Sequence, residues 1–72
     1  MTMDELAKEL GRLRAAAPVG DKVVTIHLFG IDNARRLDGR NLGDLAERAG
    51  IGKSFGTELR KGVRLAQYVT RK

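Results

Sequence analysis

The side chains able to perform acid–base, nucleophilic or metal chemistry are few in this 72-residue sequence. Cysteine is absent and His27 is the single histidine, so a thiolate site or a paired-histidine site cannot be built. Asp32 lies five residues beyond His27 and off its helical face, and no carboxylates are paired for acid and base work. We therefore expect no enzyme, no cofactor and no metal, and a packed or partly buried His27 imidazole with one hydrogen bond.

The segment Gly50-Ile-Gly-Lys-Ser54 is similar to the end of a phosphate-binding loop, in which backbone N–H groups surround phosphate and a lysine neutralises it. The first glycine of that motif would fall at Glu47, and no strand precedes the segment. A chain of this length also cannot supply the surrounding parallel sheet. We therefore expect no nucleotide site and no small-molecule substrate.

Basic side chains are the remaining chemical feature, and they are concentrated in the C-terminal half. Residues 42–72 contain seven Lys and Arg against three Asp and Glu, whereas residues 1–20 contain three of each class. An anionic partner would therefore meet the C-terminal half. The aromatic residues Phe29, Phe55 and Tyr68 are too few for a base-stacking platform, and we expect Phe29 and Phe55 in the core.

The elements that position these side chains are predicted to be helices. Thr2 and Glu5 match a capping box, which predicts that the first helix begins there, and Pro18 ends it. Its apolar residues at helical spacing are Leu6, Leu10 and Leu13.

Residues 21–37 contain β-branched side chains that would suit a strand, but period-two alternation is absent and one strand would have no partner. We predict a second helix, capped by Asp21 and ended by Asp38-Gly39. Gly30 inside it costs about 1 kcal/mol relative to alanine. The predicted apolar face consists of Val24, His27, Leu28, Ile31 and Ala34.

Asn41 is the predicted cap of a third helix that ends at Gly50, and Lys53 or Ser54 opens a fourth. Two outcomes stay open at Gly62: the fourth helix continues through it, or residues 63–70 form a short strand or an irregular tail. The predicted fold is an all-α, four-helix single domain over residues 1–72, in which the third and fourth helices form a helix-turn-helix. Their apolar positions are Leu42, Leu45, Ala46, Ala49, Phe55, Leu59, Val63 and Ala66.

Two helices that cross over a short turn need a small residue where the backbones approach, here Ala46, and a turn residue tolerant of positive φ, here Gly50. With a shared core of Leu45, Ile51 and Leu59, residues 42–59 resemble the helix-turn-helix family of short bacterial DNA-binding proteins. Gly56 departs from that pattern, because the family usually has a branched apolar residue there. The whole chain is also similar to short bacterial proteins with an HTH-like domain, through residues 26–32 and 45–51.

The resemblance implies that the fourth helix is a recognition helix, whose N-terminal residues face base edges in the major groove. Glu58 has the wrong charge for this surface, and we expect it to pair with Lys61 or to point away. The candidates for groove contact are Lys53, Ser54, Thr57 and Lys61, and those for phosphate contact are Arg60, Arg64 and the tail residues Arg71 and Lys72.

The expected partner is double-stranded DNA, with a role in transcription regulation. The alternative is a helical protein-interaction or adaptor module, because a basic stripe can also be the solvated face of a helix. A homodimer is a hypothesis, since the leucines of the first helix could exceed what so small a core buries. We expect no membrane association, because no apolar run is long enough, and a cytoplasmic location, because small secreted domains commonly depend on disulfides.

Overall fold

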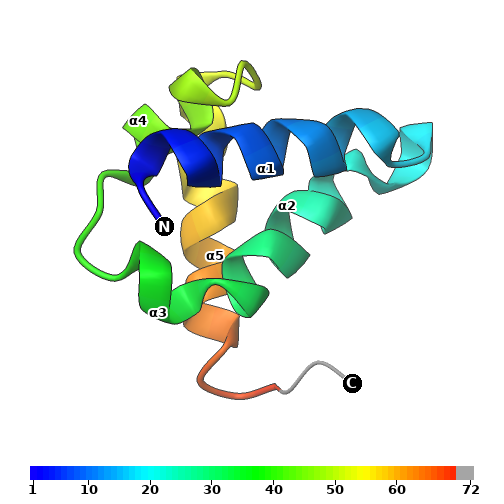
Figure 1. Ribbon diagram of the computed structural model, residues 1–72. Coiled ribbons are helices and arrows are strands. Elements are labelled where there is room, and N and C mark those ends of the chain that lie inside the picture. Colours follow the sequence, from blue (N-terminus) through cyan, green and yellow to red (C-terminus); the bar gives the residue numbers. More distant parts are fainter. Residues whose placement is uncertain (70–72) are drawn as a thin grey trace.

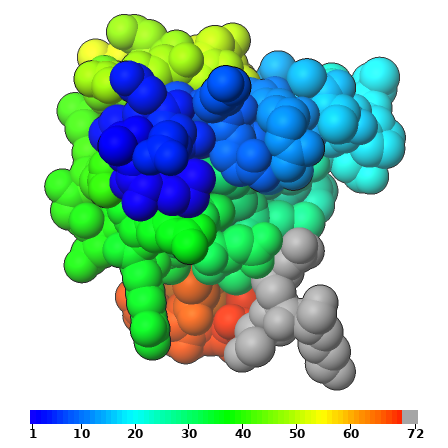
Figure 2. All heavy atoms as spheres, in the orientation of Figure 1, coloured from blue at the N-terminus to red at the C-terminus, as the bar shows by residue number. Residues whose placement is uncertain are grey.

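The computed structural model describes residues 1–69, and in that range it consists of helices and turns without a strand (Figure 1). The all-α prediction is confirmed, with five α-helices in these residues where four were predicted. The helices are α1 (Met3–Ala16), α2 (Lys22–Asp32), α3 (Ala34–Leu37), α4 (Leu42–Arg48) and α5 (Gly56–Leu65), and two 3₁₀ turns span Val19–Asp21 and Lys53–Phe55. α5 passes behind α1 and α2 in Figure 1, and in Figure 2 its last turns emerge below the segments that cover it.

The N-terminus of α1 has the predicted capping box. The Thr2 hydroxyl accepts a hydrogen bond from the Glu5 amide at 3.1 Å, and the Glu5 carboxylate accepts one from the Thr2 amide at 2.8 Å. Leu6 and Leu10 are fully buried within the single chain. Leu13, the third leucine of this helix, is partly buried and packs against the same core.

The predicted second helix is two helices, because the chain breaks at Asn33. Its backbone has φ −114° and ψ 20°, and its side-chain amide donates to the Phe29 carbonyl at 3.0 Å. A side chain that bonds a backbone carbonyl competes with the helical hydrogen-bond pattern. Asp21 stands at the N-cap of α2 as predicted, but its side chain makes no capping hydrogen bond.

The predicted apolar face of residues 21–37 is also wrong. The buried positions of α2 are Ile26, Phe29 and Gly30, whereas Val24 is 49% exposed and His27 is partly buried. The reason is that α2 packs against α5 through a glycine, which the spacing of large apolar residues does not reveal.

Gly30 and Gly62 form the point where α2 and α5 cross. A Cβ atom at Gly30 would lie 2.6 Å from the Leu59 carbonyl oxygen, and one at Gly62 would collide with the His27 carbonyl oxygen. Gly62 therefore does not end the helix: α5 continues to Leu65, and residues 66–68 form a turn. No strand follows up to residue 69, and residue 70 lies outside the described residues.

The helix-turn-helix core is present as predicted, with Leu45, Ala46, Ile51 and Leu59 all buried. The Asn41 side chain caps α4 by accepting from the Asp44 amide at 2.9 Å. Gly50 has φ +78°, the left-handed conformation that was predicted for the turn.

The start of α5 differs from the prediction, because Lys53 and Ser54 belong to a 3₁₀ turn and the α-helix begins at Gly56. The glycine at position 56 has a structural reason. A Cβ atom there would lie 2.7 Å from the Gly43 amide nitrogen, so the pair of glycines lets α4 and α5 approach closely.

Candidate nucleic-acid interface

The predicted contact residues lie in the 3₁₀ turn before α5 and on the outward side of α5, opposite the buried positions Leu59 and Gly62. Those on the helix recur at spacings of three and four, which places them on one face. The exposed members of this basic face are Lys53, Ser54, Thr57, Arg60, Lys61 and Arg64. Arg71 and Lys72, the predicted tail contacts, lie outside the described residues.

Two members of the basic face are oriented by contacts at the helix start. The Thr57 hydroxyl donates to the Ser54 carbonyl at 3.0 Å, which holds the first turn of α5 to the 3₁₀ turn. The stem of Lys53 lies over the first turn of α4, because a Cβ atom at Gly43 would be 3.3 Å from the Lys53 Cγ. Lys53 therefore spans the junction between the two helices.

The basic side chains on this surface differ in whether a carboxylate pairs with them. Among residues 1–69, the side chains of Lys53, Arg60 and Arg64 have no ion pair or hydrogen bond. Lys61 is paired with Glu58 at 3.1 Å, as predicted. By contrast, Arg12 on α1 pairs with Glu9, and Arg48 on α4 pairs with Asp4 and Asp44. The uncompensated positive charge of α5 is thus available to an anion.

Glu58 has a second partner that sequence reasoning missed. Its Oε2 atom lies 2.6 Å from His27 Nε2, which links α5 to α2 beside the glycine crossing. This confirms the prediction that His27 is a partly buried imidazole with one hydrogen bond. The hydrogen bond from His27, followed by that from Lys61, holds the pKa of the Glu58 carboxyl below its ordinary value.

Glu58→Gln is expected to remove a stability contribution that depends on pH. A carboxyl whose pKa is lower in the folded chain stabilises the fold above its unfolded pKa, which is about 4.5. That contribution is lost as the pH falls through the lower, folded pKa. Urea unfolding should therefore show the wild type to be more stable than the variant at about pH 5.5, with the difference shrinking below about pH 4.5.

Glu47→Gln is the matched control, because Glu47 is exposed and its side chain has no partner in the part of the chain that is described. Its difference from the wild type should stay small across the same pH range. A wild-type advantage over Glu58→Gln that persists unchanged at low pH would contradict the ion-pair account.

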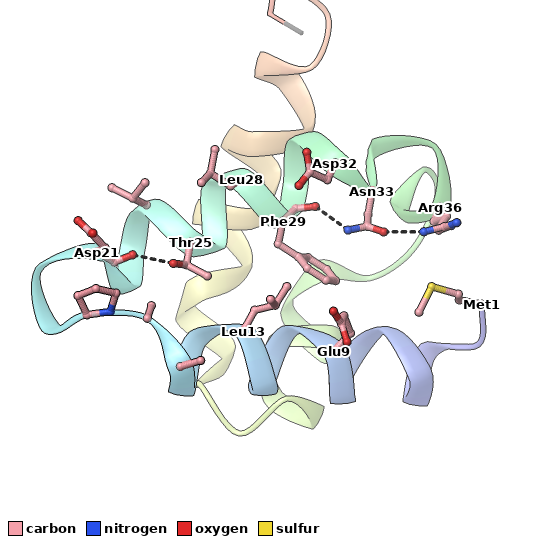
Figure 3. A pocket seen from close by; sticks show the side chains of 14 residues that line it. Met1, Glu9, Leu13, Asp21, Thr25, Leu28, Phe29, Asp32, Asn33 and Arg36 are labelled. Carbon is pink, nitrogen blue, oxygen red and sulfur yellow. Dashed lines mark hydrogen bonds between the residues drawn. The ribbon is translucent and has the colours of Figure 1, made fainter. Parts of the chain in front are cut away.

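A groove of about 720 Å³ lies between α1 and α2, on a different side of α2 from α5 (Figure 3). Its apolar lining residues include Leu13, Leu28 and Phe29, and its polar ones include Glu9 and Asp21. Val24 and Leu28, two of the residues predicted for the apolar face of the second helix, line this groove.

No helix within residues 1–69 has the length and apolar character needed to cross a membrane. In the same residues, no group of three or more His, Asp or Glu side chains is arranged to hold a metal ion.

A family model described as an HTH-like domain matches residues 2–72. Neither the curated proteins nor the solved structures yielded a match to the chain. A domain of this kind suggests a nucleic-acid-binding role, and such families are typically non-enzymatic. Because the match spans nearly all of the sequence and the fold contains the expected pair of helices, the chain belongs to the HTH-like domain family.

Proposed function

We propose that residues 1–72 act as a cytoplasmic DNA-binding domain, with α5 as the recognition helix of a transcriptional regulator that has no catalytic activity. The observation that carries the proposal is the outward face of α5, on which Arg60 and Arg64 are exposed and have no carboxylate partner within residues 1–69. Exposed cations on one face of the second helix of a helix-turn-helix are suited to double-stranded DNA.

The dimensions of α5 fit the major groove. Its ten residues span roughly 15 Å, and a helix about 10–12 Å across enters a groove about 12 Å wide. In this pose Lys53, Ser54 and Thr57 approach the base edges at the N-terminal end, with Lys61 one turn further on. Arg60 and Arg64 then reach phosphates at the groove edge.

The hydroxyl of Thr57 contributes a specific property to this pose. Because it donates its proton to the Ser54 carbonyl, its oxygen faces DNA as an acceptor. Acceptors suit the exocyclic amino groups of adenine and cytosine, which are the donors of the major groove. We therefore expect Thr57 to favour such a base at its position.

The second candidate is a protein-interaction module, and the groove between α1 and α2 favours it. Val24 lines this groove and is exposed, and an apolar helix face of a partner could pack there. A partner bound in this groove would leave α5 uncovered. Salt dependence separates the two candidates, because binding through phosphate contacts weakens steeply as the salt concentration rises, whereas binding through apolar contacts changes little.

The test is fluorescence anisotropy of a labelled mixed-sequence duplex titrated with the chain between about 50 and 200 mM salt. We expect the logarithm of the binding constant to fall linearly with the logarithm of the salt concentration, with a slope of about −0.9 for each phosphate contacted. Absence of binding at about 50 mM salt would refute the proposal. The homodimer is a separate hypothesis, which a monomeric mass by light scattering at high protein concentration would remove.

A further inference from the structure

Arg14 on α1 is a cation that the helix-turn-helix does not explain. Its guanidinium carbon lies 5.8 Å from the centre of the Phe55 ring. Its Nε atom is buried without a hydrogen-bond partner, and no carboxylate pairs with the side chain within residues 1–69. Arg12, two residues earlier on the same helix, has its own acidic partner in Glu9, at 2.6 Å.

A guanidinium without a carboxylate partner in this position lowers the stability of an isolated domain. A buried N–H without a partner loses its bond to water, and the aromatic ring offsets only part of that loss. The Lys22 ammonium does not offset this cost, because it donates to the backbone carbonyls of Arg14 and Ala17 at the end of α1, at 2.9 and 3.2 Å. A guanidinium without a carboxylate partner in the described residues is suited to an external anion.

The position of Arg14 relative to α5 identifies that anion. Phe55 is the last residue of the 3₁₀ turn that leads into α5, directly after the exposed Lys53 and Ser54. The ring therefore holds the guanidinium at the N-terminal end of α5, which is the end that enters the groove in the proposed pose. The ring lies on one side of the guanidinium, and a phosphate would bind its N–H groups.

We propose that Arg14 is a phosphate-binding residue supplied by α1, and that it binds the DNA backbone beside the groove entered by α5. Phe55 acts as a positioning residue, because it orients the guanidinium without touching DNA. The inference rests on the proposed function and extends the interface beyond the helix-turn-helix to the first helix of the chain.

The test compares Arg14→Gln with Arg12→Gln in the same anisotropy titration, each variant losing one positive charge from α1. We expect Arg14→Gln to make the slope of log binding constant against log salt shallower by about 0.9, the value for one phosphate. Arg12→Gln should leave the slope unchanged, because that guanidinium is already paired. Arg14→Lys should restore most of the slope, since the slope depends on the number of phosphates that are neutralised and lysine retains the positive charge.

The outcomes separate this inference from the proposed function. If the wild type does not bind duplex, both fail. If the wild type shows steep salt dependence and Arg14→Gln has the same slope, only the role of Arg14 is overturned. A weaker affinity of Arg14→Gln with an unchanged slope and a lowered melting temperature would likewise assign Arg14 a structural role and overturn phosphate binding.

Discussion

Gly62→Ala should lower the melting temperature of the domain by roughly 10 to 20 °C, corresponding to about 2 to 3 kcal/mol for a chain of this size. The added methyl group would collide with the His27 carbonyl oxygen and lie 3.0 Å from the Gly30 Cα atom. Both neighbours are backbone atoms of α2, so the helices must separate. The gain in helix propensity from glycine to alanine, about 1 kcal/mol, is too small to offset that separation.

Circular dichroism during heating measures this effect, with Gly20→Ala as the control. Gly20 has no atom within 4 Å of an added Cβ and no positive φ. Its substitution should change the stability by no more than about 0.5 to 1 kcal/mol, and in the stabilising direction if at all. Equal melting temperatures for Gly62→Ala and Gly20→Ala would mean that α2 and α5 do not cross at the glycine pair.

The double variant Arg60→Gln/Arg64→Gln should bind duplex DNA on the order of tenfold more weakly at low salt, with a slope against salt that is shallower by about 1.8. Both side chains are exposed on α5 without a carboxylate partner in the described residues, so their loss removes two phosphate contacts and little folding energy. Anisotropy titration measures the affinity and the slope together.

Lys8→Gln/Arg12→Gln is the matched control for this double variant. It lowers the net charge by the same two units, but both residues lie on α1, and both side chains are exposed. If affinity depended only on net charge, the two double variants would weaken binding equally. That result would contradict an interface centred on α5.

The parts of the fold that sequence reasoning predicted depend on contacts between near neighbours in the chain. The capping box of Thr2 and Glu5 lies within one helical turn, and so does the Asn41 cap. The left-handed Gly50 follows from turn chemistry, which also depends on a few adjacent residues. These features are determined locally, and the sequence pattern was sufficient to predict them.

The predictions that are wrong share a different origin, because they concern positions where segments far apart in the sequence contact each other. From helix propensity alone, Gly30 weakens its helix and Gly62 is a position where the helix could end. Each is required by the other, through a backbone contact between residues far apart in the chain. The same crossing turns Ile26 and Phe29 inward and leaves Val24 exposed, so the spacing of large apolar residues predicted the wrong face of α2.

The candidate site likewise combines features that the sequence predicted with contacts that it did not predict. The resemblance to the helix-turn-helix family implied that Thr57, Arg60 and Arg64 face DNA, and the structure has all three exposed. The pairing of Glu58 with His27 joins residues 31 positions apart, and the stacking of Arg14 on Phe55 joins α1 to the 3₁₀ turn before α5. No local pattern indicates either contact, since both depend on how the helices cross.

The measurement that tests the DNA-binding account most directly is an NMR titration of the ¹⁵N-labelled chain with a mixed-sequence duplex at about 50 and 200 mM salt. If α5 binds DNA, amide shift changes should be concentrated in residues 53–64, with a second, smaller group around Arg14, and both should fade at the higher salt. Absence of amide shift changes at low salt would contradict DNA binding by α5. Shift changes centred on Val24 and Leu28 that do not depend on salt would contradict it as well. Either result would favour a protein partner in the groove between α1 and α2.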